Sequence, residues 1–166
     1  WDQVLKHYDV QAEAARDYYS ALLKGCSKAA AVDIGWAGSG AIMLDHAVNR
    51  LWNLNCPIIG ILAGTPGSQS PEPDDTESFF IRGQLVSYLF SQRKNRDLWK
   101  VHDPWKGYNL YWELLLGAPE GGLRGFYRNE KGEAVVQLRK SRTDPGRIEE
   151  IHRGIMDFVQ IFSETE

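Results

Sequence analysis

Hydrophobic residues recur along the chain with spacings that differ from one segment to the next. An apolar position at every third or fourth residue predicts a helix over 3–24, which Gly25 closes. Nearly continuous apolar runs predict buried parallel strands over 29–34 and 57–63. Between these strands, a broad apolar face predicts a helix from about 40 to 53. Strand, glycine-rich turn, helix and strand together are typical of the first unit of a nucleotide-binding α/β fold.

The middle of the chain is less regular. Residues 66–78 carry no large apolar side chain and predict a mobile loop, which is able to close over a ligand as a lid. Residues 79–90 fit either a helix or a strand, and their aromatic and β-branched side chains favour a strand over 82–90. A further helix is expected over 105–116, ending near Gly117.

The last third of the chain predicts a hairpin and a helix. Leu123–Arg128 and Ala134–Arg139 flank a four-residue loop, 129–132, which is typical of a β-hairpin. Asp144 as a cap and Pro145 at the first helical position predict where the final helix begins. Six apolar residues form one stripe along it: Ile148, Ile151, Ile155, Phe158, Val159 and Phe162.

These elements predict a single Rossmann-like, three-layer α/β domain over 1–166, with a short, mostly parallel sheet, a C-terminal β-hairpin and a terminal amphipathic helix. A chain of 166 residues is long enough to bury its own core. Because it begins at Trp1 rather than at a methionine, we expect it to be excised from a longer multidomain protein.

Charge and composition exclude several classes of protein. The net charge is −3 and the Lys and Arg residues are scattered, so a nucleic-acid partner is not expected. No apolar run reaches the roughly 18 residues of a membrane span, and no signal-peptide pattern opens the chain. Cys26 and Cys56 lie far apart, and the four histidines do not cluster, so neither a metal site nor a cofactor is expected. Unpaired cysteines fit a reducing compartment, and we expect a cytoplasmic protein.

The loop Gly35–Gly40 has several interpretations. A dinucleotide fingerprint needs G-x-G-x-x-G and an acid after the second strand, and both are missing here. A methyltransferase loop needs the same acid after the second strand, which is missing here. A P-loop needs a lysine after the glycines, and none follows in this chain. Backbone amides from Gly38 to Ala41, with the hydroxyl of Ser39, are suited to cradle a phosphate, with no side chain filling their approach. Alternatively, the glycines only make a tight turn and Trp36 is a packing residue.

The sequence therefore offers two sets of candidate site residues. Asp33, at a strand end, and Glu113, a lone charge among apolar residues, are the candidates for catalysis. The candidate ligand or phosphate contacts lie in the glycine loop, after the second strand and in the hairpin: Gly35, Trp36, Gly38, Ser39, Gly40, Thr65 and Arg124.

Two stretches of the chain resemble a known family. The first runs from Val32 to Gly40, and the second runs from Trp112 to Pro119 and is followed by the hairpin and the final helix. They resemble the C-terminal region of large bacterial proteins described as predicted hydrolases of the HAD superfamily. Those proteins are often encoded among surface-polysaccharide genes or attached to glycosyltransferase domains. The resemblance spans most of 15–162.

The resemblance implies a role in polysaccharide biosynthesis but no phosphatase activity. A HAD phosphatase needs an Asp-x-Asp motif, whereas Asp33 is followed by Ile34 and Gly35. The glycine–serine loop is also similar in form to the donor-diphosphate loop of two-domain glycosyltransferases. We therefore expect an accessory domain that binds a phosphorylated small molecule or nucleotide-sugar and works with other domains of the same protein. The alternative is a non-catalytic interaction domain that positions an upstream hydrolase or glycosyltransferase.

Overall fold

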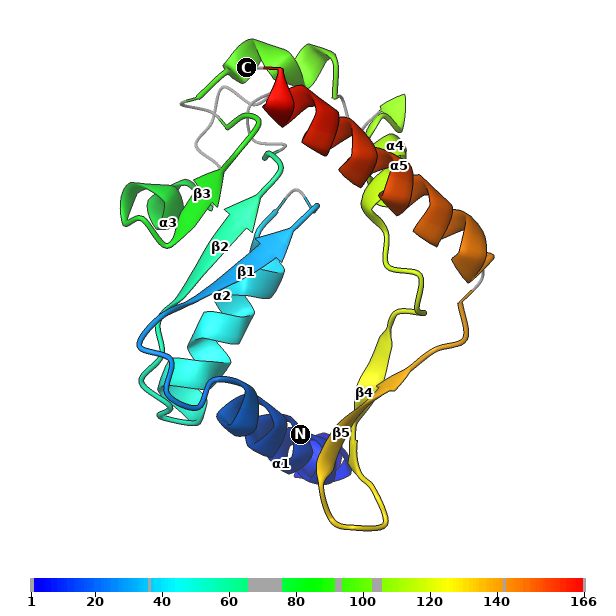
Figure 1. Ribbon diagram of the computed structural model, residues 1–166. Helices are drawn as coiled ribbons and strands as arrows, with labels where there is room; N and C mark the ends of the chain where they lie inside the picture. Colours follow the sequence, from blue (N-terminus) through cyan, green and yellow to red (C-terminus); the bar gives the residue numbers. More distant parts are fainter. Residues whose placement is uncertain are drawn as a thin grey trace. The chain divides into compact units, whose positions relative to one another are not determined.

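The computed structural model describes residues 2–35, 37–65, 76–91, 94–102, 106–141 and 143–165. The chain forms two compact units, each with its own sheet (Figure 1). One unit is Arg16–Asn109, and the other joins Trp1–Ala15 to Leu110–Glu166. The expectation of one domain over the whole chain stays a prediction. No helix in the described ranges is both long and apolar enough to cross a membrane.

A three-stranded parallel sheet forms the centre of the unit Arg16–Asn109. Its strands β1 (Ala29–Asp33), β2 (Ile58–Leu62) and β3 (Leu85–Ser87) lie in the order β1-β2-β3 (Figure 1). Between β1 and β2 the chain forms α2 (Ser39–His46), which continues as the π-helix η1 (Ala47–Leu51). The predicted strand–helix–strand unit is thus confirmed, and its elements end within two residues of their expected bounds.

The core of this unit lies between α2–η1 and one face of the sheet. Its buried residues form two clusters, one of Ala41, Leu62 and Leu85 and the other of Val48, Cys56 and Ile58. Side chains alternate between the faces of a strand, and on the opposite face Val32 is 74% exposed and Val86 48% exposed. Within the described residues of this unit the sheet is therefore covered on one face, and the expected three-layer arrangement is not shown.

The segment between β2 and the end of β3 differs from its prediction. Residues 77–81 form a short helix, α3 (Glu77–Ile81), and the strand that follows covers only the centre of the expected range 82–90. Phe79 and Phe80 pack against the Ala41 cluster, so tertiary packing outweighs their preference for a strand. The prediction of a loop over 66–78 is wrong at its end, because Glu77 and Ser78 are helical, and its residues 66–75 lie outside the described residues.

The second unit is built around the predicted hairpin. Its strands β4 (Leu123–Arg128) and β5 (Ala134–Leu138) pair antiparallel, and Gly132 in their loop has a φ of +78°. The helix before them, α4 (Asn109–Leu116), ends as predicted but begins four residues later. The first part of α1 (Asp2–Leu22) also belongs to this unit. In the other unit, η3 (Arg96–Lys100) is a short 3₁₀ helix.

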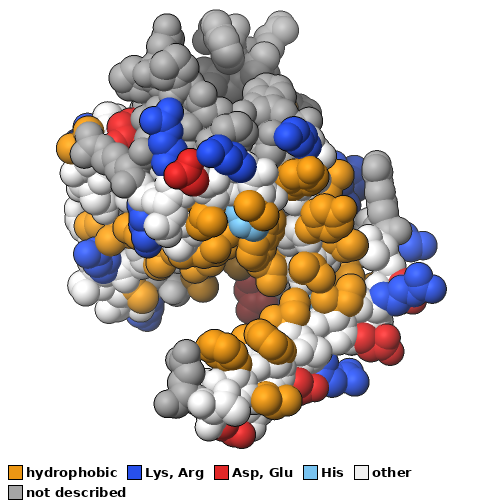
Figure 2. Space-filling view, turned by 90° about the horizontal axis from the view of Figure 1, so that it is seen from above, with side chains coloured by type: hydrophobic (Ala, Val, Ile, Leu, Met, Phe, Trp, Pro, Cys, Tyr) orange, Lys and Arg blue, Asp and Glu red, His pale blue; other side chains and the backbone are white. Residues whose placement is uncertain are grey.

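The final helix, α5 (Pro145–Glu164), begins where predicted, but only part of its apolar stripe is buried. Ile148 is 5% exposed, whereas Phe158 and Phe162, which stack on each other, are 66% and 54% exposed. Figure 2 shows hydrophobic side chains gathered on the face of the molecule that this view presents. The stripe is therefore present, but three of its six residues, Phe158, Val159 and Phe162, are exposed within the described part of its unit.

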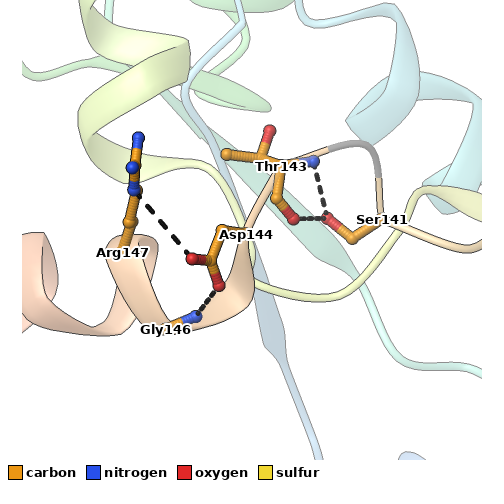
Figure 3. Close-up of polar contacts among 5 residues, drawn as sticks. All are labelled: Ser141, Thr143, Asp144, Gly146 and Arg147. Atoms are coloured by element: carbon orange, nitrogen blue, oxygen red, sulfur yellow. Dashed lines mark hydrogen bonds and ion pairs between the residues drawn. The ribbon is translucent and has the colours of Figure 1, made fainter.

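Asp144 caps this helix as predicted. Its Oδ1 accepts a hydrogen bond from the amide of Gly146 at 3.1 Å, and its Oδ2 lies 3.9 Å from Nε of Arg147 (Figure 3). Because the ion pair is exposed, the cap contributes most of the stabilisation. We expect Asp144→Ala to lower the free energy of unfolding by about 1 kcal/mol and Asp144→Ser to change it much less. Thermal unfolding followed by circular dichroism measures both, and equal losses in the two variants would contradict the capping role.

Candidate functional site

The candidate site lies at the carboxyl edge of the parallel sheet. β1, β2 and β3 run in the same direction, so the loops that follow them leave from one edge (Figure 1). In open α/β sheets this edge is where ligands bind. The described loop residues there come from the glycine loop after β1, from Thr65 after β2 and from 88–91 after β3.

The amino terminus of α2 presents backbone donors at this edge. Gly38 is the residue before the helix, and its carbonyl accepts the first helical hydrogen bond, from the amide of Ile42 at 3.0 Å. Ser39 and Gly40 are exposed, and no group in the described part of the chain accepts a hydrogen bond from their amides. No side chain caps the helix. Two donors at the positive end of a helix are therefore open to an anion.

Gly38 has a structural role that the sequence interpretation missed. Its φ is +68°, which favours glycine, and a Cβ there would lie 2.8 Å from Cδ1 of Leu62 and 2.9 Å from Cδ1 of Leu85. A side chain at Gly38 would therefore meet the core, whereas a Cβ at Gly40 would meet nothing within 4 Å. The expectation that no side chain fills the approach to the amides of this loop stays a prediction.

Asp33 is engaged within its own loop. Its Oδ1 accepts a hydrogen bond from the amide of Gly35 at 2.6 Å, which holds the turn at the end of β1. The amide of Gly35 is consequently used, and it is not a free donor for a ligand. The observed role of Asp33 is therefore in the turn, and its catalytic role stays a prediction.

Tyr88, directly after β3, is the residue at this edge that sequence reasoning did not find. Burial raises the pKa of its phenol above its ordinary value, and the negative charge of Asp33 raises that pKa further. The two groups therefore interact across the end of the sheet. Once the strand is known to end at Ser87, the order of the residues places Tyr88 at this edge.

The interaction of Asp33 with Tyr88 gives a measurable titration. We expect Asp33→Asn to lower the pKa of Tyr88 while leaving it above the ordinary 10.0, because burial is the larger cause. A pH titration of the Tyr88 ring by carbon NMR measures the shift. Asp97→Asn is the control, since Asp97 is exposed and pairs with Lys100 on η3. A Tyr88 pKa that is the same in Asp33→Asn and the unsubstituted protein would contradict the interaction.

Other side chains after β2 and β3 are largely taken up by the fold. Thr65 is 2% exposed, so little of its surface is open to a ligand. Ser91 is 5% exposed, and its Oγ accepts a hydrogen bond from the amide of Lys94 at 3.2 Å. Nζ of Lys94 donates to the carbonyl of Ser87 at 3.3 Å. This lysine is exposed, so it is a cation near the end of β3 that the sequence analysis did not include.

The remaining candidates lie outside the described part of this unit. Arg124, on β4, and Glu113, on α4, belong to the other compact unit. Trp36 lies outside the described residues. Among the described residues, no group of three or more His, Cys, Asp or Glu side chains is placed to hold a metal ion.

The comparisons with known proteins add no relative. No family model, curated protein or solved structure matches this chain. The resemblance to the C-terminal region of HAD-associated bacterial proteins therefore stays a prediction.

Proposed function

We propose that this chain is an accessory domain that binds the phosphate or diphosphate group of a small molecule, such as a nucleotide-sugar, at the amino terminus of α2. The observation that carries the proposal is the pair of amides of the exposed residues Ser39 and Gly40, which have no acceptor within the described chain. They lie at the carboxyl edge of a parallel sheet, where the helix dipole favours negative charge. The hydroxyl of Ser39 is a further donor.

Two substitutions at Gly40 test this proposal. Gly40→Asp places a carboxylate beside the two amides, which stabilises the helix by about 0.3–1 kcal/mol but repels an anion. Gly40→Ala keeps the amide and adds no charge, and its Cβ meets nothing within 4 Å. Calorimetric titration with uridine diphosphate should show binding to the unsubstituted protein and to Gly40→Ala, and at least tenfold weaker binding to Gly40→Asp. Equal binding to all three proteins, or no binding to any, would refute the site.

An interaction domain is the second candidate, and the uncovered side chains favour it. Val32 and Val86 are exposed on the open face of the sheet, and Phe158 is exposed in the apolar stripe of α5. Apolar surface of this kind marks a contact with another protein segment. If a further domain of a full-length protein covers the sheet, amides of β1 and β3 will exchange hydrogen more slowly in that protein than in this chain. Identical exchange rates would argue against this candidate.

A further inference from the structure

A cavity lies at the opposite, amino edge of the parallel sheet, away from the glycine loop. Its volume is about 400 Å³, within the range of small-molecule sites. Lys28, just before β1, forms one wall, and Asp45, Asn49 and Arg50 of α2–η1 form another. Gln84, just before β3, contributes a side-chain amide. All of these residues belong to one compact unit.

The one carboxylate among the described lining residues is already engaged. Oδ1 of Asp45 accepts hydrogen bonds from the amide of Ile58 at 2.9 Å and from Nδ2 of Asn49 at 2.8 Å. By contrast, the side chains of Lys28 and Arg50 make no ion pair or hydrogen bond within the described ranges. The lining therefore carries two positive charges against one negative charge in a chain whose net charge is −3.

We propose that this cavity binds the oxyanion group, phosphate or carboxylate, of a small molecule. Arg50 is suited to this role because its planar guanidinium donates two parallel hydrogen bonds to such a group. Lys28 adds a second positive charge from the other wall of the cavity. Arg50 also lies in the last turn of a helix, where the helix dipole favours a cation without any ligand. Lys28 precedes a strand, so no helix dipole favours its charge.

Amide NMR during titration with inorganic phosphate, and separately with succinate, tests this site. Phosphate that binds in the cavity shifts the resonances of Gly83 and Gln84 and saturates them, whereas phosphate at α2 shifts those of Ser39 and Gly40. A larger response to phosphate than to succinate identifies a phosphate site, and the reverse identifies a carboxylate site.

Variants distinguish this cavity from the site at α2. Arg50→Gln and Lys28→Gln should each weaken the Gln84 response at least fivefold, with an unchanged melting temperature to show that the fold is intact. Lys131→Gln, in the hairpin loop, removes the same charge elsewhere and should have no effect. Gly40→Asp should also leave the Gln84 response unchanged, so the two sites fail independently. No saturable shift at Gly83 and Gln84 with either anion, or equal affinity in Arg50→Gln and Lys131→Gln, would overturn the proposal.

Discussion

Gly38→Val should lower the free energy of unfolding by about 2–6 kcal/mol. A β-branched residue at a φ of +68° costs about 1–3 kcal/mol in backbone strain. The overpacking cost adds about 1–3 kcal/mol, because a Cβ would lie within 3 Å of methyl groups on Leu62 and Leu85. Both leucines belong to the core between α2 and the sheet, so the damage reaches the centre of the unit. Urea denaturation measures the loss.

Gly40→Ala is the matched control for that substitution. Gly40 lies in the first turn of α2 with open space around it, so alanine should leave stability unchanged or raise it by up to about 1 kcal/mol. If both variants unfold at the same urea concentration, the close packing of Gly38 is not important for stability. The contrast also shows that a bulky residue at Gly38 is a poor probe of ligand binding, because it disturbs the fold first.

Asp45→Ala should lower the free energy of unfolding by about 2–4 kcal/mol. It removes the carboxylate that ties α2 to the first residue of β2, and the amide of Ile58, a residue only 4% exposed, is left without its acceptor. Asn49 also loses one of its two hydrogen bonds and keeps the one to the carbonyl of Cys56. Thermal unfolding measures the effect.

Asp45→Asn is the conservative variant for this tie. Its side-chain oxygen accepts the same two hydrogen bonds without the charge, so the loss should be at most half of that for alanine. An Asp45→Ala protein that melts at the same temperature as the unsubstituted one would contradict the tie between helix and strand.

The strand–helix–strand unit was predictable from the sequence because each part has a local cause. Continuous apolar runs specify parallel strands, and glycines with a serine mark the turn into the helix. The hairpin and the Asp144 cap were predictable for the same reason. All of these signals lie within a few residues of the feature that they predict.

The parts that failed depend on contacts between distant residues. The sequence around Phe79 and Phe80 fits either a helix or a strand, and they lie on a helix that packs against Ala41, far away in the sequence. Leu62 and Leu85, which leave no room for a side chain at Gly38, are likewise far from it in the sequence. At the candidate site, the sequence predicted the helix from about residue 40, one residue after α2 begins at Ser39. The interaction of Tyr88 with Asp33 depended on where β3 ends.

The most direct test of a phosphate site at α2 is an amide NMR titration of this chain with uridine diphosphate. The account predicts that the amide protons of Ser39 and Gly40 move most, downfield and to saturation, as they donate to phosphate oxygens. In Gly40→Asp the shift at Ser39 should be lost, while the remaining resonances show that the fold is intact. If the amide resonances of Ser39 and Gly40 do not shift at saturating nucleotide, or if the same shifts persist in Gly40→Asp, the phosphate site at α2 is contradicted.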